Sequence, residues 1–317
     1  MAIMGMNRPG LRMAAPVVVS MLTLGSLVAS GCSTAGAQAA ANPRVVRVTA
    51  AENFWGSIAM QLGGSHAHVT SIIANPNTDP HSYEPTAADA RAVASARLVI
   101  ENGVGYDPWM SRLLAANSGE HISVLNVGEA VGAPADGNPH RWYNPADVRT
   151  VIGKLTADLS RADPADRAYF ARREARLLNV GLRQYHALIA TIRARYAGTP
   201  VGASESIFAM LAPALGLRLI TPASFLKAIT EGTEVSAADK RTIDAQISEH
   251  KIKIYVYNSQ NVTPDVQAQL AAARAAHIPV ASITETMTPP AASYQQWQVR
   301  QLRAIAAALA TAEGHKT

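Results

Sequence analysis

Residues 163–198 read DPADRAYFARREARLLNVGLRQYHALIATIRARYAG, and this stretch divides the chain into two halves. Asp163 is placed to cap a helix, Pro164 suits its first position and Gly198 ends it. Apolar residues recur near helical spacing within the stretch, and they are Leu177, Leu178, Val180, Leu182, Tyr185, Leu188 and Ile189. The pattern predicts one long helix over residues 163–197 that connects the two halves.

The predicted connecting helix is long enough to span the whole folded body. At about 1.5 Å per residue, its length would be on the order of 50 Å. A single helix of this kind is a stiff connector, unlike the flexible strands that permit wide hinge closure. Gly181 lies near its middle, so the alternative is two shorter helices that are broken at this residue.

Short β-branched runs alternate with helical patterns on both sides of the connector, which indicates βαβ units and parallel sheets. The runs that predict strands cover 44–50, 68–73, 97–103 and 121–127 before the connector, and 199–204, 217–223, 252–258 and 278–284 after it. The patterns that predict helices cover 54–62, 87–96, 108–116, 236–250, 263–276 and a last segment from about Tyr294. We therefore expect an α/β protein with two parallel-sheet lobes, residues 44–162 and 198–317, joined by the long helix.

The chain begins with a segment typical of secreted proteins. Residues 1–31 contain Arg8 and Arg12, then an apolar run and small residues, as a signal peptide does. Cys32 is the only cysteine, so it has no intramolecular disulfide partner, and its position after small residues resembles a bacterial lipobox. The resemblance implies cleavage before Cys32, lipidation of its thiol and a flexible tether over residues 32–43. An ordinary signal peptide with an incidental cysteine is the alternative.

The composition argues against a nucleic-acid-binding protein. Hydrophobic residues make up 48% of the chain, which is enough for a substantial core, whereas aromatic residues make up only 5%. The formal net charge is +5, and the basic residues do not cluster with aromatic ones. We therefore expect no nucleic-acid partner.

Four side chains with affinity for metal ions follow predicted strands. His81 and His140 lie in loops after strands of the first half, each with prolines nearby on both sides. Glu205 and Glu285 come directly after strands of the second half. Open α/β sheets bind ligands at the carboxyl ends of their strands, so the four side chains are candidates for one site. Two imidazoles and two carboxylates would bind a divalent transition metal, although spacing alone does not establish that they converge.

The segments around these four residues contain recognisable motifs. The histidines lie in DPHSYEPTAAD (79–89) and PHRWYNP (139–145), and the glutamates lie in ASESIFAMLAPALGL (203–217) and SITETM (282–287). Together with EVSAAD (234–239), these segments resemble the metal-binding class of solute-binding proteins of bacterial ABC importers, the zinc and manganese receptors. The resemblance covers nearly all of the chain that follows the tether.

The resemblance implies that His81, His140, Glu205 and Glu285 hold one divalent transition metal ion, zinc or manganese, as cargo between the lobes. It also implies a lipid-anchored receptor outside the cell membrane, which delivers the ion to an ABC permease and catalyses no reaction; we expect a monomer. Two positions are informative. Glu285 stands where the family usually has Asp, and Glu205 stands where zinc receptors often have His and manganese receptors Glu.

Two other classes of function remain open on the sequence alone. A metal-dependent hydrolase on the same fold would need an open coordination position and a general base. The sequence contains no H-E-x-x-H or G-x-S-x-G motif, and Ser204 and Ser206 have no evident triad partner. A surface adhesin or structural lipoprotein with a vestigial site would keep the fold and bind no metal.

Residues beside the candidate histidines have structural interpretations as well. Tyr83 and Trp142 are expected to pack in the core. Asp79 and Glu84 are either partners that orient a histidine or solvated loop charges.

We predict that Cys32→Ala, expressed in the native host, moves the protein from the membrane fraction to the soluble fraction. The tether would lose its only thiol for acylation. Cell fractionation and immunoblotting measure the change, and Ser33→Ala is the control because it leaves the thiol in place. Membrane retention of Cys32→Ala would contradict lipidation at this residue.

Overall fold

The computed structural model describes residues 45–117 and 122–314, which all belong to one compact unit. The predicted signal peptide, the tether and Cys32 lie outside these residues. None of the helices in the described ranges is long and apolar enough to cross a membrane.

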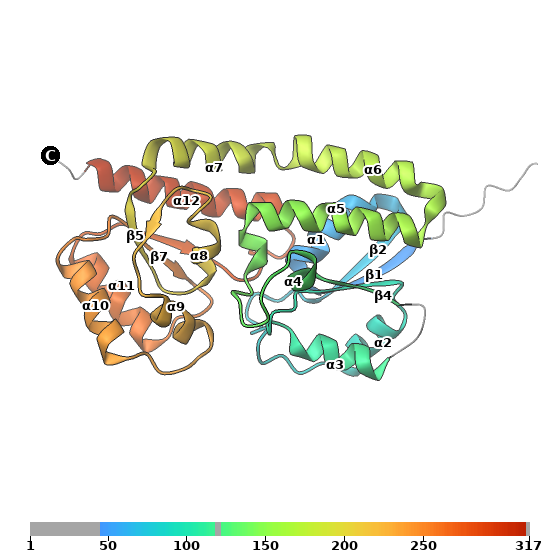
Figure 1. Ribbon diagram of the computed structural model, residues 1–317, viewed down its shortest axis with the longest axis horizontal. Coiled ribbons are helices and arrows are strands. Elements are labelled where there is room, and N and C mark those ends of the chain that lie inside the picture. The colour runs from blue at the N-terminus through green and yellow to red at the C-terminus, as the bar shows by residue number, and fades with distance from the viewer. Residues whose placement is uncertain (1–44, 118–121, 315–317) are drawn as a thin grey trace, which may run out of the picture. The chain divides into compact units, whose positions relative to one another are not determined.

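The first lobe is built on a parallel sheet whose strands lie in the order β2-β1-β3-β4. The strands are β1 (Val46–Glu52), β2 (Ala67–Ile73), β3 (Leu98–Glu101) and β4 (Ser123–Asn126), and each overlaps a predicted run. Helices α1 (Asn53–Gly63) and α5 (Pro145–Ala162) cover one face, and α2 (Ala87–Ala94) and α3 (Pro108–Ala116) cover the other (Figure 1). The short elements are η1 (Gly64–His66), α4 (Val127–Ala130) and η2 (Arg141–Tyr143). The sequence patterns did not predict α5, which Asn144 caps.

The second lobe repeats this topology, with parallel strands in the order β6-β5-β7-β8. The strands are β5 (Pro200–Ala203), β6 (Arg218–Leu219), β7 (Tyr255–Asn258) and β8 (Val280–Ile283). The helices are α8 (Ile207–Leu211), α9 (Ala223–Thr230), α10 (Ala237–Ser248), α11 (Pro264–Ala275) and α12 (Tyr294–Gly314). Strand β6 is shorter than predicted for two reasons. Ala203 N donates its hydrogen bond to the Thr221 side chain (2.9 Å) rather than to the backbone of β6, and Pro222 begins the turn into α9.

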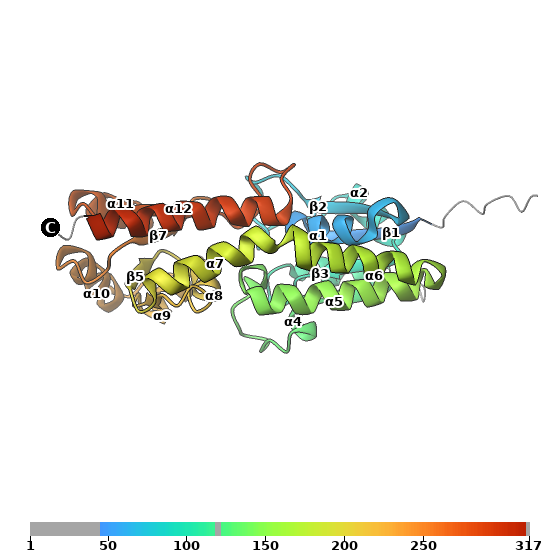
Figure 2. The same cartoon turned by 90° about the horizontal axis from the view of Figure 1, so that it is seen from above.

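The connector between the lobes is helical but not uniform. A 3₁₀ turn η3 (Pro164–Asp166) leads into α6 (Arg167–Arg176), the π-helical segment η4 (Leu177–Gly181) and then α7 (Arg183–Tyr196). Within η4, Leu182 N donates to Leu177 O at 2.8 Å, five residues back. The connector is therefore neither one regular helix nor two separate helices broken at Gly181. It is one helical path that contains an irregular turn near that residue. Helices α7 and α12 run side by side across the second lobe (Figure 1 and Figure 2).

Buried aromatic residues join the lobes beside this connector. Phe54 of α1 stacks on Trp142, with the ring centroids 4.0 Å apart. From the second lobe, the Tyr294 hydroxyl donates to Trp142 O (2.6 Å), and the Tyr143 hydroxyl donates in turn to Thr284 O (2.7 Å). Packed rings and hydrogen bonds therefore fix the lobes to each other, in addition to the connector.

A cluster of buried acids lies under the end of β1 in the first lobe. Glu52 is fully buried, and Asp107 accepts hydrogen bonds from Asn102 N (2.7 Å) and Gly103 N (2.8 Å). Gly103 has a φ of 70°, which favours glycine in this tight loop. Burial and the nearby Asp107 carboxylate raise the pKa of Glu52 well above its usual value, and burial raises the pKa of Asp107 to about 7. Burial therefore favours the protonated form of Glu52.

This burial predicts a pH dependence of folding. A carboxyl group whose pKa is raised in the folded state stabilises the fold while it is protonated, and this contribution is lost as the pH rises from the unfolded pKa towards the folded one. Glu52→Gln removes the titration, so the variant should be more stable than the parent at about pH 8 by on the order of 1 kcal/mol or more, and closer to it at about pH 5. Urea unfolding of the metal-free proteins measures both values.

Glu129→Gln is the control for this comparison, because Glu129 is exposed on α4 and undergoes the same chemical change. Its free energy of unfolding should follow that of the parent at both values of pH. An equal difference between Glu52→Gln and the parent at both values would contradict the assignment of a raised pKa.

Candidate metal centre

The loop that carries His81 is held from within the first lobe. Asp79 accepts a hydrogen bond from His81 N (2.9 Å), and Trp109 Nε1 donates to Pro80 O (3.1 Å). The His81 ring meets Tyr106 edge to face, with the centroids 4.8 Å apart. At the end of this loop, the Thr86 side chain caps α2 by accepting from Asp89 N (3.3 Å). His81 is therefore a side chain on a stiff loop, and it remains 32% exposed.

His140 is fully buried, and its neighbours set its tautomer. Asn138 Oδ1 accepts from both His140 N (3.0 Å) and His140 Nδ1 (2.8 Å). The amide of Asn138 is itself oriented because its Nδ2 donates to Ser206 O (2.6 Å) in the second lobe. With Nδ1 protonated, Nε2 keeps a lone pair, which is the form in which histidine binds a metal.

Glu205 lies two residues after the end of β5 and is almost completely buried. Asn258 Nδ2 donates to Glu205 Oε2 at 2.8 Å, and Asn261 Nδ2 lies 3.4 Å from the same oxygen. Within the part of the chain that the structure describes, the other oxygen, Oε1, is buried with no hydrogen-bond partner. A buried carboxylate oxygen without a donor is costly, and a bound cation would remove that cost.

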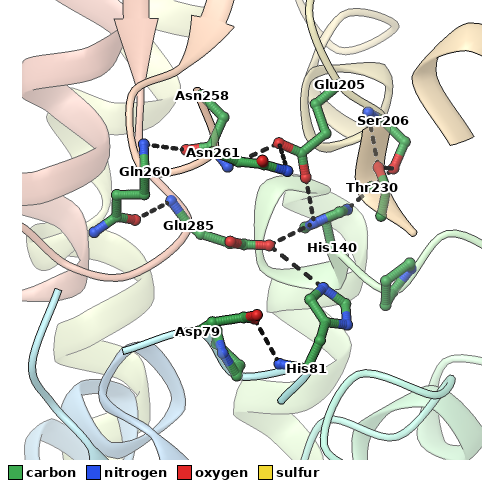
Figure 3. A network of polar contacts seen from close by, with 12 residues as sticks. Asp79, His81, His140, Glu205, Ser206, Thr230, Asn258, Gln260, Asn261 and Glu285 are labelled. Carbon is green, nitrogen blue, oxygen red and sulfur yellow. Dashed lines mark hydrogen bonds and ion pairs between the residues drawn. The ribbon is translucent and has the colours of Figure 1, made fainter. Parts of the chain in front are cut away.

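The four predicted side chains converge at the boundary between the lobes (Figure 3). Glu285 Oε1 lies 3.2 Å from His140 Nε2 and 3.7 Å from His81 Nε2, and the ligand atoms of these three residues lie within 4.8 Å of one another. Glu205 Oε1 lies 3.7 Å from His140 Nε2 and so joins the cluster through that imidazole. The arrangement thus brings together three donor atoms, from His81, His140 and Glu285, and places Glu205 beside them at His140.

The charges of this cluster are balanced only in part. Burial and the charge of Glu285 raise the pKa of Glu205 to about 8. Burial alone would raise the pKa of Glu285, but its contacts with His140 and His81 outweigh it and lower that pKa to about 2. Burial also lowers the pKa of His140, which favours the neutral imidazole. Glu285 is therefore charged and Glu205 protonated at neutral pH without a cation, and a divalent cation would stabilise both carboxylates in the charged form.

A cleft of about 460 Å³ opens beside the cluster. His81 and Glu285 line it from the two lobes, and two further acids, Asp79 and Glu231, lie along its wall. This space is larger than a bare metal ion and is lined by oxygen-bearing groups. It gives a hydrated cation access to the side of the site where His81 is exposed.

The residues beside the ligands match the sequence interpretation in part. Trp142 is buried in the core, and Tyr83 packs edge to face on Trp109 with centroids 5.0 Å apart. Asp79 orients the backbone of His81 rather than its ring, and Glu84 is exposed.

Sequence reasoning missed the amide side chains that hold the ligands, which are Asn138, Asn258, Asn261 and Gln260. A signal was available for one of them. Asn258 ends a predicted strand, which is the criterion that identified the glutamates.

Two α/β lobes with this cluster between them define a two-lobed binding protein whose site lies at the lobe boundary. The family to which the chain belongs is described as zinc-uptake complex component A, periplasmic, and its model matches residues 48–308. The match covers both lobes and the four candidate ligands. It confirms the resemblance to metal-binding solute-binding proteins.

Two curated relatives are similar over part of their length. The manganese-binding lipoprotein MntA of Halalkalibacterium halodurans is 27% identical over 158 residues, which is 48% of this chain and 52% of that protein. The iron-binding protein YfeA of Yersinia pestis is 26% identical over 172 residues, 51% of this chain and 54% of that protein. The chain therefore spans about half the length of each relative in these matches.

Solved structures share the fold over nearly their whole length. A periplasmic metal-binding protein from Candidatus Liberibacter asiaticus has a TM-score of 0.68 at 18% identity, covering 83% of this chain and 98% of that one. The solute-binding protein FpvC of Pseudomonas aeruginosa, solved in complex with Mn²⁺, has a TM-score of 0.67 at 20% identity, covering 84% and 98%. These likenesses confirm the two-lobed α/β fold.

We predict that Glu285→Ala weakens metal binding by about 100-fold or more. Loss of a residue that only hydrogen-bonds a metal ligand typically costs roughly 10–100-fold in affinity, and loss of a ligand should cost more. Glu285→Asp keeps a carboxylate at shorter reach and should lose less. Chelator competition with zinc measures both dissociation constants.

Glu231→Ala is the matched control, because it removes an exposed carboxylate from the wall of the same cleft. It should leave the dissociation constant within a few-fold of the parent value. Binding by Glu285→Ala that equals the parent's would remove Glu285 from the ligand set.

Proposed function

We propose that this protein captures a divalent transition metal ion, zinc or manganese, outside the cytoplasmic membrane and delivers it to an ABC permease. His81, His140, Glu205 and Glu285 are the ligands. The observation that carries the proposal is the buried Oε1 of Glu205, which lacks a hydrogen-bond donor and lies 3.7 Å from a histidine nitrogen. A bound cation would supply the partner that this oxygen lacks.

The donor set suits the proposed cargo. Imidazole nitrogen and carboxylate oxygen are ligands that zinc, manganese and iron all accept, whereas a site for calcium would be built of oxygen alone. Each lobe supplies two ligands, so an ion at this point would bind to both lobes at once. The ion is cargo, and its release to the permease completes the function.

A hydrolytic function is less well supported. Ser206 Oγ lies 3.3 Å from His140 Nδ1, but that nitrogen already donates to Asn138 Oδ1, and Ser206 Oγ lies 2.7 Å from Thr230 Oγ1. Ser204 Oγ accepts from Asn258 N (3.1 Å) in the interior. Neither serine has a free base, and the relatives compared above are named as metal-binding proteins rather than enzymes.

The cellular setting is part of the same proposal. A signal peptide, an acylated Cys32 and a tether over residues 32–43 would hold the two lobes, as a monomer, at the outer side of the membrane. One relative is named a lipoprotein, and the family is described as periplasmic. A vestigial site on an adhesin or structural lipoprotein would instead bind no metal after gentle purification, whereas a receptor should contain about one equivalent.

We predict that zinc stabilises the metal-free protein more than manganese does at equal free concentration. The Irving–Williams order gives zinc the higher affinity for such a mixed site, and stabilisation rises with the logarithm of ligand concentration over dissociation constant. Thermal melts with each ion measure the shift in Tm. A larger shift with manganese would show that the site imposes a geometry that zinc disfavours, and manganese would then be the cargo.

The double variant His81→Ala/His140→Ala should lose most of the zinc-dependent shift, because both nitrogen ligands are removed. Its control is His68→Ala/His250→Ala, which removes two exposed histidines outside the cluster. The control should keep the shift of the parent. An undiminished shift in the first variant would overturn the proposed site.

A further inference from the structure

The Gln260 side chain lies beside the metal centre and makes four hydrogen bonds with its amide group. Its Oε1 accepts from Glu285 N (2.7 Å) and Thr286 N (2.9 Å), which fixes the start of the loop that carries Glu285. Its Nε2 donates to Thr286 Oγ1 (2.8 Å) and to Pro76 O (2.7 Å). Both ends of one amide are therefore fully used.

The bond to Pro76 crosses between the lobes. Pro76 belongs to the loop between β2 and α2 that carries His81. Inside the first lobe, this loop is held at its other end by the bond from Trp109 Nε1 to Pro80 O. Gln260 thus holds, from the second lobe, the loop of a ligand that belongs to the first lobe.

Gln260 is itself fixed by the residue that holds Glu205. Asn258 Oδ1 accepts from Gln260 N (3.0 Å), while Asn258 Nδ2 donates to Glu205 Oε2 (2.8 Å) (Figure 3). The two amides therefore connect both glutamates of the cluster to one short segment at the end of β7. Gln260 extends this connection to the opposite lobe.

We propose that Gln260 is the positioning residue that couples His81 to Glu285, so that the two ligands from opposite lobes are held at binding distance together. The inference rests on the proposed metal-binding function. Gln260 does not belong to the cluster of ligand atoms and acts through the two loops that it joins. Loss of its amide would free the His81 loop from the second lobe and speed the release of the ion through the cleft that both loops line.

The chemistry requires an amide at this position. A carboxylate of the same length would still accept from Glu285 N and Thr286 N, but it would face Pro76 O with a lone pair instead of a donor. Methionine has a similar length and neither group. Gln260→Glu therefore removes both donations from Nε2, but the Thr286 hydroxyl can donate to the new carboxylate in return, whereas Pro76 O cannot, so the contact between lobes is the one that is lost. Gln260→Met removes the donor and the acceptor of the amide together.

The test is zinc affinity and zinc dissociation rate for Gln260→Met in the full chain, by chelator competition and stopped-flow chelation. Affinity should fall by about 10–100-fold, mainly through faster dissociation. Gln184→Met on α7 is the control, since it makes the same exchange at an exposed site. Unchanged affinity and dissociation rate in Gln260→Met, with zinc bound normally by the parent, would overturn this inference and leave the proposed function intact.

Double-mutant cycles separate positioning from general stabilisation. Gln260→Met should cost much less in zinc affinity when Glu285→Ala or His81→Ala is already present, because the ligand that it positions is gone. Additive losses in both cycles would indicate a structural role and overturn the proposal.

If Gln260→Met does not fold, Gln260→Glu replaces it and should couple to His81→Ala only. Additive losses of zinc affinity in that cycle would overturn the proposal equally. A parent that binds neither zinc nor manganese overturns the proposed function together with this inference.

Discussion

The structure depends on the confinement of two carboxylates and an imidazole in a space from which water is largely excluded. Glu205, Glu285 and His140 are all nearly or fully buried, and like charges so close together repel strongly at low dielectric. Amides donate to one oxygen of Glu205 and fix the backbone of Glu285. The other oxygen of Glu205 has no donor among the described residues, and Oε1 of Glu285 faces the two imidazoles. Protonation of Glu205 relieves this repulsion in part, and a cation entering from the cleft would relieve it with both carboxylates charged.

Two buried carboxyl groups stay this close only if the surrounding structure does not let them move apart. Sheets of identical strand order end at the same boundary, and the rings of Phe54, Trp142 and Tyr143 pack there. Helix α12 adds a second tie, because Gln295 near its start bonds to Gln61 of α1 in the other lobe. Because two helical connections and a packed aromatic junction join the lobes, the carboxylates can move apart only by disrupting that packing. Their unfavourable proximity therefore remains until an ion binds.

Much of this arrangement could be predicted from the sequence, for reasons that are local. Strands were identified by β-branched runs, and Glu205 and Glu285 by their place directly after such runs, since the carboxyl ends of parallel strands share an edge. The rest depends on contacts over long separations. Nothing near Gln260 or Asn138 in the sequence indicates the partner that each has in the other lobe, which is Pro76 O for Gln260 and Ser206 O for Asn138. Helix α5 was missed although it begins with an Asn-Pro pair, and the irregular turn η4 follows from how α6 and α7 pack on different lobes.

The irregular turn η4 sets the angular phase between the two parts of the connector. Helix α6 packs on α1 and α5 of the first lobe, whereas α7 packs on α12, with Tyr185 fully buried beside Tyr294. Each residue of a regular helix turns by about 100°, and a π turn takes up one extra residue within nearly the same rotation. If the same residues formed a regular helix without this turn, everything after it would be rotated by about 100°, and the buried face of α7 would no longer point at α12. The irregularity thus fixes which side chains of α7 face the second lobe.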